Sequence, residues 1–448
     1  MKSRKLFSLA LVLMAAASLG GCQTFQNIFS WNRNKIKIEG ERVSIVAADQ
    51  QFAADPQLAA MEVTLPPPVA NPDWPQPGEN ASNKVDHLQA AGALRRLWTA
   101  SAGHGTDRDS ILTAPPIVAG GVVYAMDSQS HVYAYNAETG ARLWDLDTAP
   151  PDEDEPERAF GGGIAFDNGR LFVASGFGTV KALDPRTGKQ IWNAKVETPL
   201  HSAPVVAGGR VYVVSQENQL VVFDANDGHL LWDHQGIVEP AGIATSPSVA
   251  VSGDTVIVPY SSGELYALRV DNGSPYWNDQ LTRTGNVTAL TVINDIAGSP
   301  VIDRDLVFAI SQSGTFVAIN LRTGGRLWTR NVGGIQTPLI AGDFVFLVST
   351  EGQVLCLSRA DGRIKWTSDL PSFGDKVNRE DPIVWTGPLL VSNRLLLFSS
   401  DGHAVSLNPA SGQKMNEIAI PDGTFVPPIM ANGTLYLLTN DAKLVALR

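Results

Sequence analysis

A repeated motif is the feature that most constrains the fold of this chain, and it recurs from residue 115 to the end. In each copy a Pro opens a short apolar segment, and two further apolar segments follow between turns that contain Gly. A last turn ends in Gly, and a Trp stands four residues after it, as in the copy from Gly178 to Trp192. Repeats of about 40 to 50 residues with several short strands each are typical of β-propeller blades.

Six Trp residues stand at the end of this motif, Asn416 stands there in one more copy, and a seventh Trp lies in a segment that matches the end of a copy. The seven are Trp98, Trp144, Trp192, Trp232, Trp277, Trp328 and Trp366. Successive positions of this kind are 38 to 51 residues apart. Gly provides the positive φ of the turn, and Trp is large enough to fill the seam between two blades if its indole N–H meets a carbonyl. We therefore expect these Trp residues to dock blades together rather than to form a platform for a ligand.

The two ends of the repeat region complement each other. The last copy, which ends at Arg448, lacks a fourth strand, whereas the segment from Arg96 to Thr99 matches the fourth strand of a complete copy, Arg326 to Thr329. Pairing of the two ends would close the ring and remove exposed sheet edges. The sequence thus predicts an all-β fold, an eight-bladed β-propeller over residues 94–448, with four antiparallel strands per blade.

Residues 1–21 have the features of a signal peptide. Basic residues at the start, among them Lys2 and Lys5, precede the apolar stretch 6–19, which is shorter than the roughly 20 residues of a membrane-spanning helix. The sequence from Leu19 to Cys22 resembles the lipobox of bacterial lipoproteins. That resemblance implies that Cys22 is the lipidated first residue of the mature protein, with acyl chains such as palmitate, and several acyl chains anchor a protein stably.

The residues after Cys22 indicate a location and a tether. By resemblance to lipoprotein sorting, Asp directly after the lipidated Cys would favour the inner membrane, and Gln23 instead implies the periplasmic face of the outer membrane. Residues 22–93 contain seven Pro and no sustained hydrophobic period. Such sequence is semi-rigid and packs poorly, so we expect a tether between membrane and propeller. Within it, residues 35–46 have the apolar side chains for a local element or a contact with a partner.

Composition and residue spacing argue against several functions. A formal net charge of -11 is unlike the clustered Lys and Arg of a nucleic-acid-binding protein. The seven His and two Cys have no metal-ligand spacing, and Cys356 lies in an apolar run that suits a small buried side chain. The acidic run 152–157 is typical of a solvated loop. We expect neither a catalytic group nor a bound metal or cofactor.

The segment from Ala182 to Trp192, with the pattern Ala-x-Asp-x-x-Thr-Gly-x-x-x-Trp, resembles the quinoprotein (PQQ-type) repeat. Two families share this repeat: periplasmic PQQ-dependent dehydrogenases and BamB, a lipoprotein of the β-barrel assembly (BAM) machinery. The dehydrogenases carry an adjacent Cys-Cys disulfide, carboxylate and amide ligands for Ca²⁺, and an Asp base. This chain has no adjacent Cys pair, and together with its lipobox it is more similar to BamB. A PQQ-dependent dehydrogenase and an envelope-stress sensor remain the alternatives.

The resemblance to BamB implies a non-enzymatic scaffold in the outer membrane. Such a subunit docks on the POTRA domains of BamA, meets other BAM subunits, and supports insertion of β-barrel proteins, with nascent barrel strands as a further possible partner. For the docking site we predict the loops 237–245 and 289–299, with Leu290 and Ile293 as apolar anchors and Asp295 facing a basic group. The alternatives are that Asp295 is only a loop or turn residue and that the apolar segment is a strand of its own blade.

Overall fold

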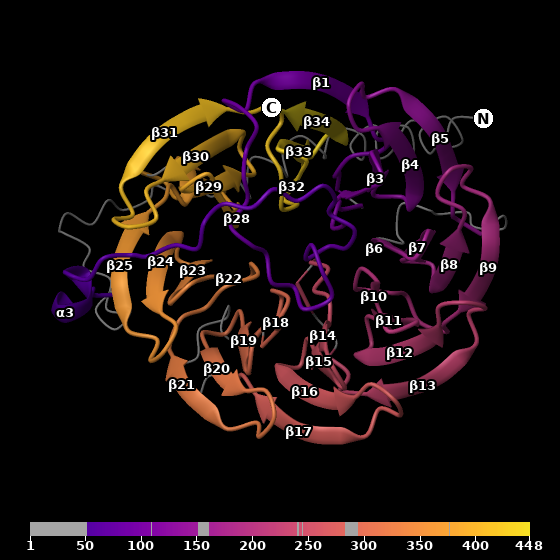
Figure 1. Ribbon diagram of the computed structural model, residues 1–448, viewed down its shortest axis with the longest axis horizontal. Coiled ribbons are helices and arrows are strands. Elements are labelled where there is room, and N and C mark those ends of the chain that lie inside the picture. Colours follow the sequence, from indigo (N-terminus) through magenta and orange to yellow (C-terminus); the bar gives the residue numbers. More distant parts are fainter. Residues whose placement is uncertain are drawn as a thin grey trace, which may run out of the picture. The chain divides into compact units, whose positions relative to one another are not determined.

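In the computed structural model, residues 52–108, 110–150, 161–239, 242–243, 245–282, 294–375 and 377–448 are described. These residues form eight four-stranded antiparallel sheets, which are arranged as blades around a central axis (Figure 1). This confirms the predicted all-β, eight-bladed propeller. No helix among the described residues is long and apolar enough to cross a membrane.

The blades follow one another in chain order. In the first seven blades the strands also follow chain order, from the innermost strand to the outermost (Figure 1). The first blade is β2 (Ile117–Ala119), β3 (Val122–Met126), β4 (His131–Asn136) and β5 (Arg142–Asp147); the second is β6 (Gly162–Asp167), β7 (Arg170–Ser175), β8 (Thr179–Leu183) and β9 (Gln190–Lys195); the third is β10 (Val205–Ala207), β11 (Arg210–Val214), β12 (Gln219–Asp224) and β13 (Leu230–Gln235); the fourth is β14 (Ala250–Ser252), β15 (Thr255–Pro259), β16 (Glu264–Arg269) and β17 (Pro275–Gln280).

The remaining blades continue the ring. The fifth is β18 (Val301–Asp303), β19 (Leu306–Ile310), β20 (Phe316–Asn320) and β21 (Arg326–Arg330); the sixth is β22 (Leu339–Ala341), β23 (Phe344–Val348), β24 (Gln353–Ser358) and β25 (Ile364–Asp369); the seventh is β28 (Trp385–Val391), β29 (Arg394–Ser399), β30 (His403–Leu407) and β31 (Lys414–Ala419); the eighth is β32 (Ile429–Ala431), β33 (Thr434–Leu438), β34 (Lys443–Leu447) and β1 (Arg96–Ser101). A separate hairpin of β26 (Phe373–Asp375) and β27 (Glu380–Pro382) lies between the sixth and seventh blades.

The eighth blade is built from both ends of the repeat region. Strand β1 pairs antiparallel with β34, and Trp98 lies opposite Ala446 in this register. Figure 1 shows β1 completing the ring beside β34. The predicted closure of the propeller by its N-terminal strand is confirmed.

Each of the seven motif Trp residues contacts the next blade in the same way. Its indole N–H donates to a backbone carbonyl there, over 2.8 to 3.1 Å, and its ring lies against the Gly that ends the following turn. That Gly has a φ between 68° and 76° in all seven turns. Asn416 holds the corresponding position on β31, and the blade that follows is the eighth, whose third and fourth strands come from opposite ends of the chain. No such turn joins them, so a Trp at position 416 would lack the Gly and the carbonyl that the others use.

The antiparallel order gives the ring two different faces. The turns from first to second strand and from third to fourth strand lie on one side, which we call the hairpin face. The turns from second to third strand and the connections between blades lie on the other side, which we call the loop face. The described residues of both predicted docking loops, 237–239, 242–243, 245 and 294–299, stand in connections between blades and therefore belong to the loop face.

Residues 53–93 were predicted to be part of a tether, and here the structure differs from the expectation. The short helix α3 (Pro56–Ala59) lies on β25, and residues 62–93, which we call the strap, then cross the hairpin face into the centre of the ring (Figure 1). The strap has no period because it pairs with one blade at a time. Trp74 exchanges two backbone hydrogen bonds with Val118, and Ala81 O accepts a hydrogen bond from Val251 N. Residues 1–51, with the predicted signal peptide and Cys22, lie outside the described residues.

Single side chains of the strap fill the channel of the propeller. Gln76 bonds both the N–H and the carbonyl of Val206, and Asn83 Nδ2 donates to two carbonyls, those of Val249 and Pro300. These inner strands have no further neighbour toward the axis, and the strap satisfies backbone groups that would otherwise need water. The channel is therefore closed from the hairpin face by the chain itself.

Candidate protein-binding site

The two predicted docking loops meet at Asp295. Its side chain is 1% exposed, and its Oδ2 accepts a hydrogen bond of 2.8 Å from the backbone N–H of Ile243 in the other loop. Burial raises the pKa of Asp295 to about 6, although the Ile243 N–H acts in the opposite direction. The carboxylate thus joins two loops and does not face solvent, unlike the expectation that it would meet a basic group of a partner. Leu290 and Ile293 lie outside the described residues.

An exposed apolar pair stands in the first of these loops, directly after β13. Ile237 and Val238, which we call the apolar knob, are 59% and 56% exposed. Glu264 Oε2 accepts the Ile237 N–H over 2.7 Å, and Asn218 Nδ2 donates to the Ile237 carbonyl over 2.6 Å. The side chains of Glu264 and Asn218 are themselves buried. The backbone of the knob is therefore held at Ile237, while both apolar side chains are exposed and can contact another molecule.

Aromatic rings support the knob from behind. The chain turns at Gly236, where an added Cβ would come within 2.7 Å of the Tyr260 ring. His234 Nδ1 lies 2.9 Å from Tyr260 Oη, and the His234 ring stacks on Tyr260 and contacts Tyr266. Burial lowers the pKa of His234 and raises that of Tyr260. These groups are arranged for packing and rigidity, and they form the seam between the third and fourth blades.

Sequence reasoning named the loop of the knob but not its two residues. A signal was present, since two β-branched apolar residues follow the last strand of a blade after a single Gly, in a connection where polar residues are usual. What the sequence does not contain is the pair of buried groups, Glu264 and Asn218, that reach the loop from neighbouring turns. Their partners are set by the stacking of two blades.

A cavity of about 160 Å³ remains in the channel beneath the strap. Its floor is formed by strap residues, among them Trp74 and Val85, and its walls by the first residues of several blades. Half-exposed residues of the loop face, such as Thr113 and Thr245, and the exposed Phe425 stand at its mouth. Among the described lining residues there is no Asp, Glu, Lys, Arg, His or Cys.

That lining does not fit a quinone cofactor with Ca²⁺. Carboxylate oxygens are the ligands that Ca²⁺ prefers, and none of the described lining residues carries one. The single described Cys, Cys356, is buried in β24, where burial raises the pKa of its thiol. The volume also lies below the roughly 300 to 1,000 Å³ of usual small-molecule sites.

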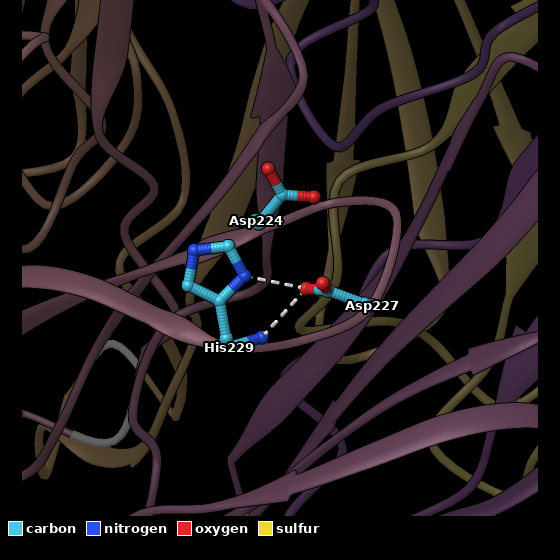
Figure 2. Close-up of side chains that lie close together, drawn as sticks. All are labelled: Asp224, Asp227 and His229. Carbon is cyan, nitrogen blue, oxygen red and sulfur yellow. Dashed lines mark hydrogen bonds and ion pairs between the residues drawn. The ribbon is translucent and has the colours of Figure 1, made fainter.

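One group of side chains has the composition of a cation site. Asp224, Asp227 and His229 lie on the turn from β12 to β13, with one potential ligand atom of each within 4.8 Å of the others (Figure 2). Asp227 Oδ1 accepts the backbone N–H of His229 and lies 2.6 Å from its Nδ1, and these two bonds lower the pKa of Asp227.

The turn itself accounts for this group. Asp224 Oδ1 accepts the N–H of Asn226 over 2.7 Å, as Asp184 Oδ1 accepts the N–H of Arg186 in the same turn of the second blade. All three residues are exposed or half-exposed. Their arrangement is that of a capped turn between two blade strands, and we do not assign a metal to it.

Comparison with known proteins gives a family match and two kinds of structural neighbour. The sequence model of the family described as outer membrane protein assembly factor BamB matches residues 81–154 and 128–368, which together cover more than half of the chain. BamB of Burkholderia pseudomallei is 26% identical over 238 residues, which cover 53% of this chain and 59% of that protein. The chain spans little more than half the length of this protein and of two uncharacterized proteins, from Rickettsia prowazekii and Rickettsia conorii, to which it is 28% and 27% identical.

Two solved structures share the fold. The crystal structure of BamB from Moraxella catarrhalis has a TM-score of 0.65 at 20% identity and covers 80% of this chain and 100% of that one. The quinohemoprotein alcohol dehydrogenase of Comamonas testosteroni also has a TM-score of 0.65, at 16% identity, and covers 90% of this chain and 83% of that one. At these identities the likeness shows the propeller alone, and the fold hosts both kinds of protein.

Proposed function

This chain belongs to the family of the outer membrane protein assembly factor BamB, and from that membership we propose that it is a non-catalytic scaffold subunit of the machinery that inserts β-barrel proteins into the outer membrane. Its partners in this proposal are the POTRA domains of BamA. The observation that carries the proposal is the apolar knob, Ile237 and Val238, exposed on the loop face and fixed by buried Glu264 and Asn218.

A fixed apolar pair suits protein binding for an energetic reason. Apolar anchors near the centre of an interface usually contribute more to affinity than charges at its rim. Since the Ile237 peptide is already bonded at both its N–H and its carbonyl, little conformational entropy is lost when a partner covers it. Asp295 supports the same surface by joining the next loop to Ile243.

The proposed attachment to the membrane depends on Cys22 and on the path of the strap. We propose that residues 1–21 are removed, that Cys22 carries the lipid, and that the protein lies at the periplasmic face of the outer membrane. The described chain enters the propeller at the sixth blade and crosses the hairpin face. The described part of that segment, residues 52–93, thus leaves the loop face uncovered.

The proposal is tested by binding of the purified BamA POTRA region to knob variants. The double variant Ile237→Ser with Val238→Ser is expected to weaken binding at least tenfold without loss of melting temperature. The matched control is Leu327→Ser, which removes an apolar side chain of 50% exposure from the outer strand β21. Equal affinity of the knob variant and the control would contradict the proposed site, and absence of binding by the wild type would contradict the partner.

An enzymatic function has a separate test. Because the channel cavity has no described carboxylate or Cys side chain, protein given PQQ and Ca²⁺ is expected to reduce no artificial electron acceptor with alcohols or sugars. Quinone-dependent turnover would mean that the protein is a dehydrogenase, and the proposal of a non-catalytic scaffold would be wrong.

A further inference from the structure

Prolines at the start of five blades lie around the same cavity in the channel, and none of them belongs to the apolar knob. Pro115, Pro247, Pro338, Pro388 and Pro427 all line the channel cavity. Proline has no backbone N–H, so the wall offers no donor at these positions. The rest of the lining is mixed: it includes the buried side chains of Trp74, Leu112 and Leu389 and the uncharged polar side chains of Asn83, Thr113, Thr245, Ser246, Ser248, Ser299, Gln336 and Thr337.

The size and chemistry of the cavity define what can enter it. An apolar cavity of about 150 Å³ takes up one benzene molecule, and this cavity measures about 160 Å³. No ionisable side chain is among its described lining residues, so a charged group would lose its hydration without compensation. Asn83 Oδ1 and Thr245 Oγ1 are buried polar atoms without a hydrogen-bond partner in the described part of the chain. The cavity therefore suits one large uncharged group that is mainly apolar, and two polar atoms of its lining are available for hydrogen bonds.

The mouth of the cavity is continuous with the loops of the proposed interface. Thr245 and Ser246 stand at the mouth and follow the knob in the same connection, and Ala297 and Ser299 follow Asp295 in the next. The strap closes the opposite end. A group can therefore reach the cavity from the loop face, where a partner bound at the knob would lie.

We propose that the channel cavity is an anchor pocket, which receives the side chain of one large apolar residue, aromatic or branched, from the protein that docks on the loop face. This inference rests on the proposed function, since it adds a second contact to the same interface. The knob projects from the propeller, and the pocket receives a projection of the partner. Two such contacts fix the orientation of the partner as well as its affinity.

The first part of the test uses the free protein and benzene as a probe. Benzene is expected to raise the melting temperature of the wild type. Thr113→Trp, which places a large ring at the mouth, and Val85→Phe, which fills the cavity from the floor, are expected to abolish this shift. The matched control is Thr350→Trp, an exposed Thr in the turn from β23 to β24 on the same face, outside the cavity. No shift in the wild type would mean that the cavity is closed to an apolar group, and the inference would fail.

The second part measures the affinity of the POTRA region for the same variants. Thr113→Trp and Val85→Phe are expected to weaken binding at least tenfold, and Thr350→Trp to leave it unchanged. Val85→Phe does not protrude from the loop face, so its effect separates filling of the pocket from simple obstruction. If the wild type binds and both cavity variants bind equally well, the anchor pocket is wrong and the scaffold function stands. If the wild type does not bind, the proposed partner is wrong, and the pocket loses its occupant.

Discussion

Asp295 Oδ2 lies 2.8 Å from the backbone nitrogen of Ile243, and this hydrogen bond joins the connections that enter the fourth and fifth blades. The carboxylate is buried, with no described basic side chain bonded to it. A buried acid of this kind is costly when it is charged. Its position between two loops of the proposed interface makes the order of that surface sensitive to pH.

Asp295→Asn is expected to change how stability depends on pH. The folded protein holds the proton of Asp295 up to about pH 6, whereas the unfolded chain releases it near the ordinary pKa of 3.8. As the pH rises from about 4 to above 6, the free energy of unfolding therefore decreases, by up to roughly 3 kcal/mol from this group. Asn keeps an oxygen for the Ile243 N–H but carries no charge, so this fall should disappear. Urea unfolding at several pH values between 4 and 7 measures it, and identical pH profiles would contradict the prediction.

Lys365→Met is expected to release α3 from the sixth blade. Lys365 is 3% exposed, and its Nζ donates to the carbonyls of Leu58, Ala59 and Met61 at the end of this helix. Met matches the length of the side chain but leaves these acceptors unpaired, at a cost of about 1–3 kcal/mol. Limited proteolysis should then cut near residues 55–61. A cleavage rate equal to that of the wild type would show that α3 is held by other contacts.

Arg359→Met is expected to destabilise the whole propeller. The guanidinium of Arg359 lies 2.9 Å from Asp303 Oδ2, and both side chains are nearly buried, at 12% and 7% exposure. Removal of one partner leaves a buried charge and costs about 3–5 kcal/mol. Addition of Asp303→Asn should restore part of this loss, because it removes the isolated charge. Thermal unfolding of the single and double variants measures both the loss and the recovery of stability. No recovery in the double variant would argue against the ion pair as the cause.

The sequence predicts the parts of this protein that repeat. Six Trp residues stand four residues after a turn Gly, and with Trp98 they make the same contact in seven seams, so the blades and their closure by β1 could be anticipated. The strap repeats nothing, since Gln76 and Asn83 each bond a different blade. The burial of Asp295 and the support of Ile237 by Glu264 were equally hidden, because they depend on which turns become neighbours after the ring closes.

Cys22→Ala is expected to abolish lipid attachment and to release the protein from the membrane. The lipobox supplies the acylated residue, and without several acyl chains no other predicted element provides a stable anchor. Incorporation of labelled fatty acid and membrane fractionation measure the two effects. Labelling of the variant at the wild-type level would refute the assignment of Cys22.

Trp98→Ala is expected to open the ring at its closure. Trp98 Nε1 donates to Ala137 O in the first blade, and its ring contacts Tyr436 of β33 and packs on Gly140. Because Trp98 is half-buried, its loss should cost less than the about 3–5 kcal/mol of a fully buried Trp. The comparison variant is Trp277→Ala in the seam between the fourth and fifth blades, where the indole makes the corresponding bond to Leu321 O.

The two variants, Trp98→Ala and Trp277→Ala, should differ in which strands become less protected from hydrogen exchange. Strand β17 is joined to β16 by a covalent turn, so loss of Trp277 leaves its own blade connected. Strand β1 has no turn to β34 and is held there by backbone pairing and by the contacts of Trp98. Amide hydrogen exchange of Lys443–Leu447 should therefore rise in Trp98→Ala, whereas exchange of Glu264–Arg269 in Trp277→Ala should change much less. Equal increases in the two variants would mean that the paired ends are as firmly closed as a continuous blade, and that closure by β1 does not depend on its Trp.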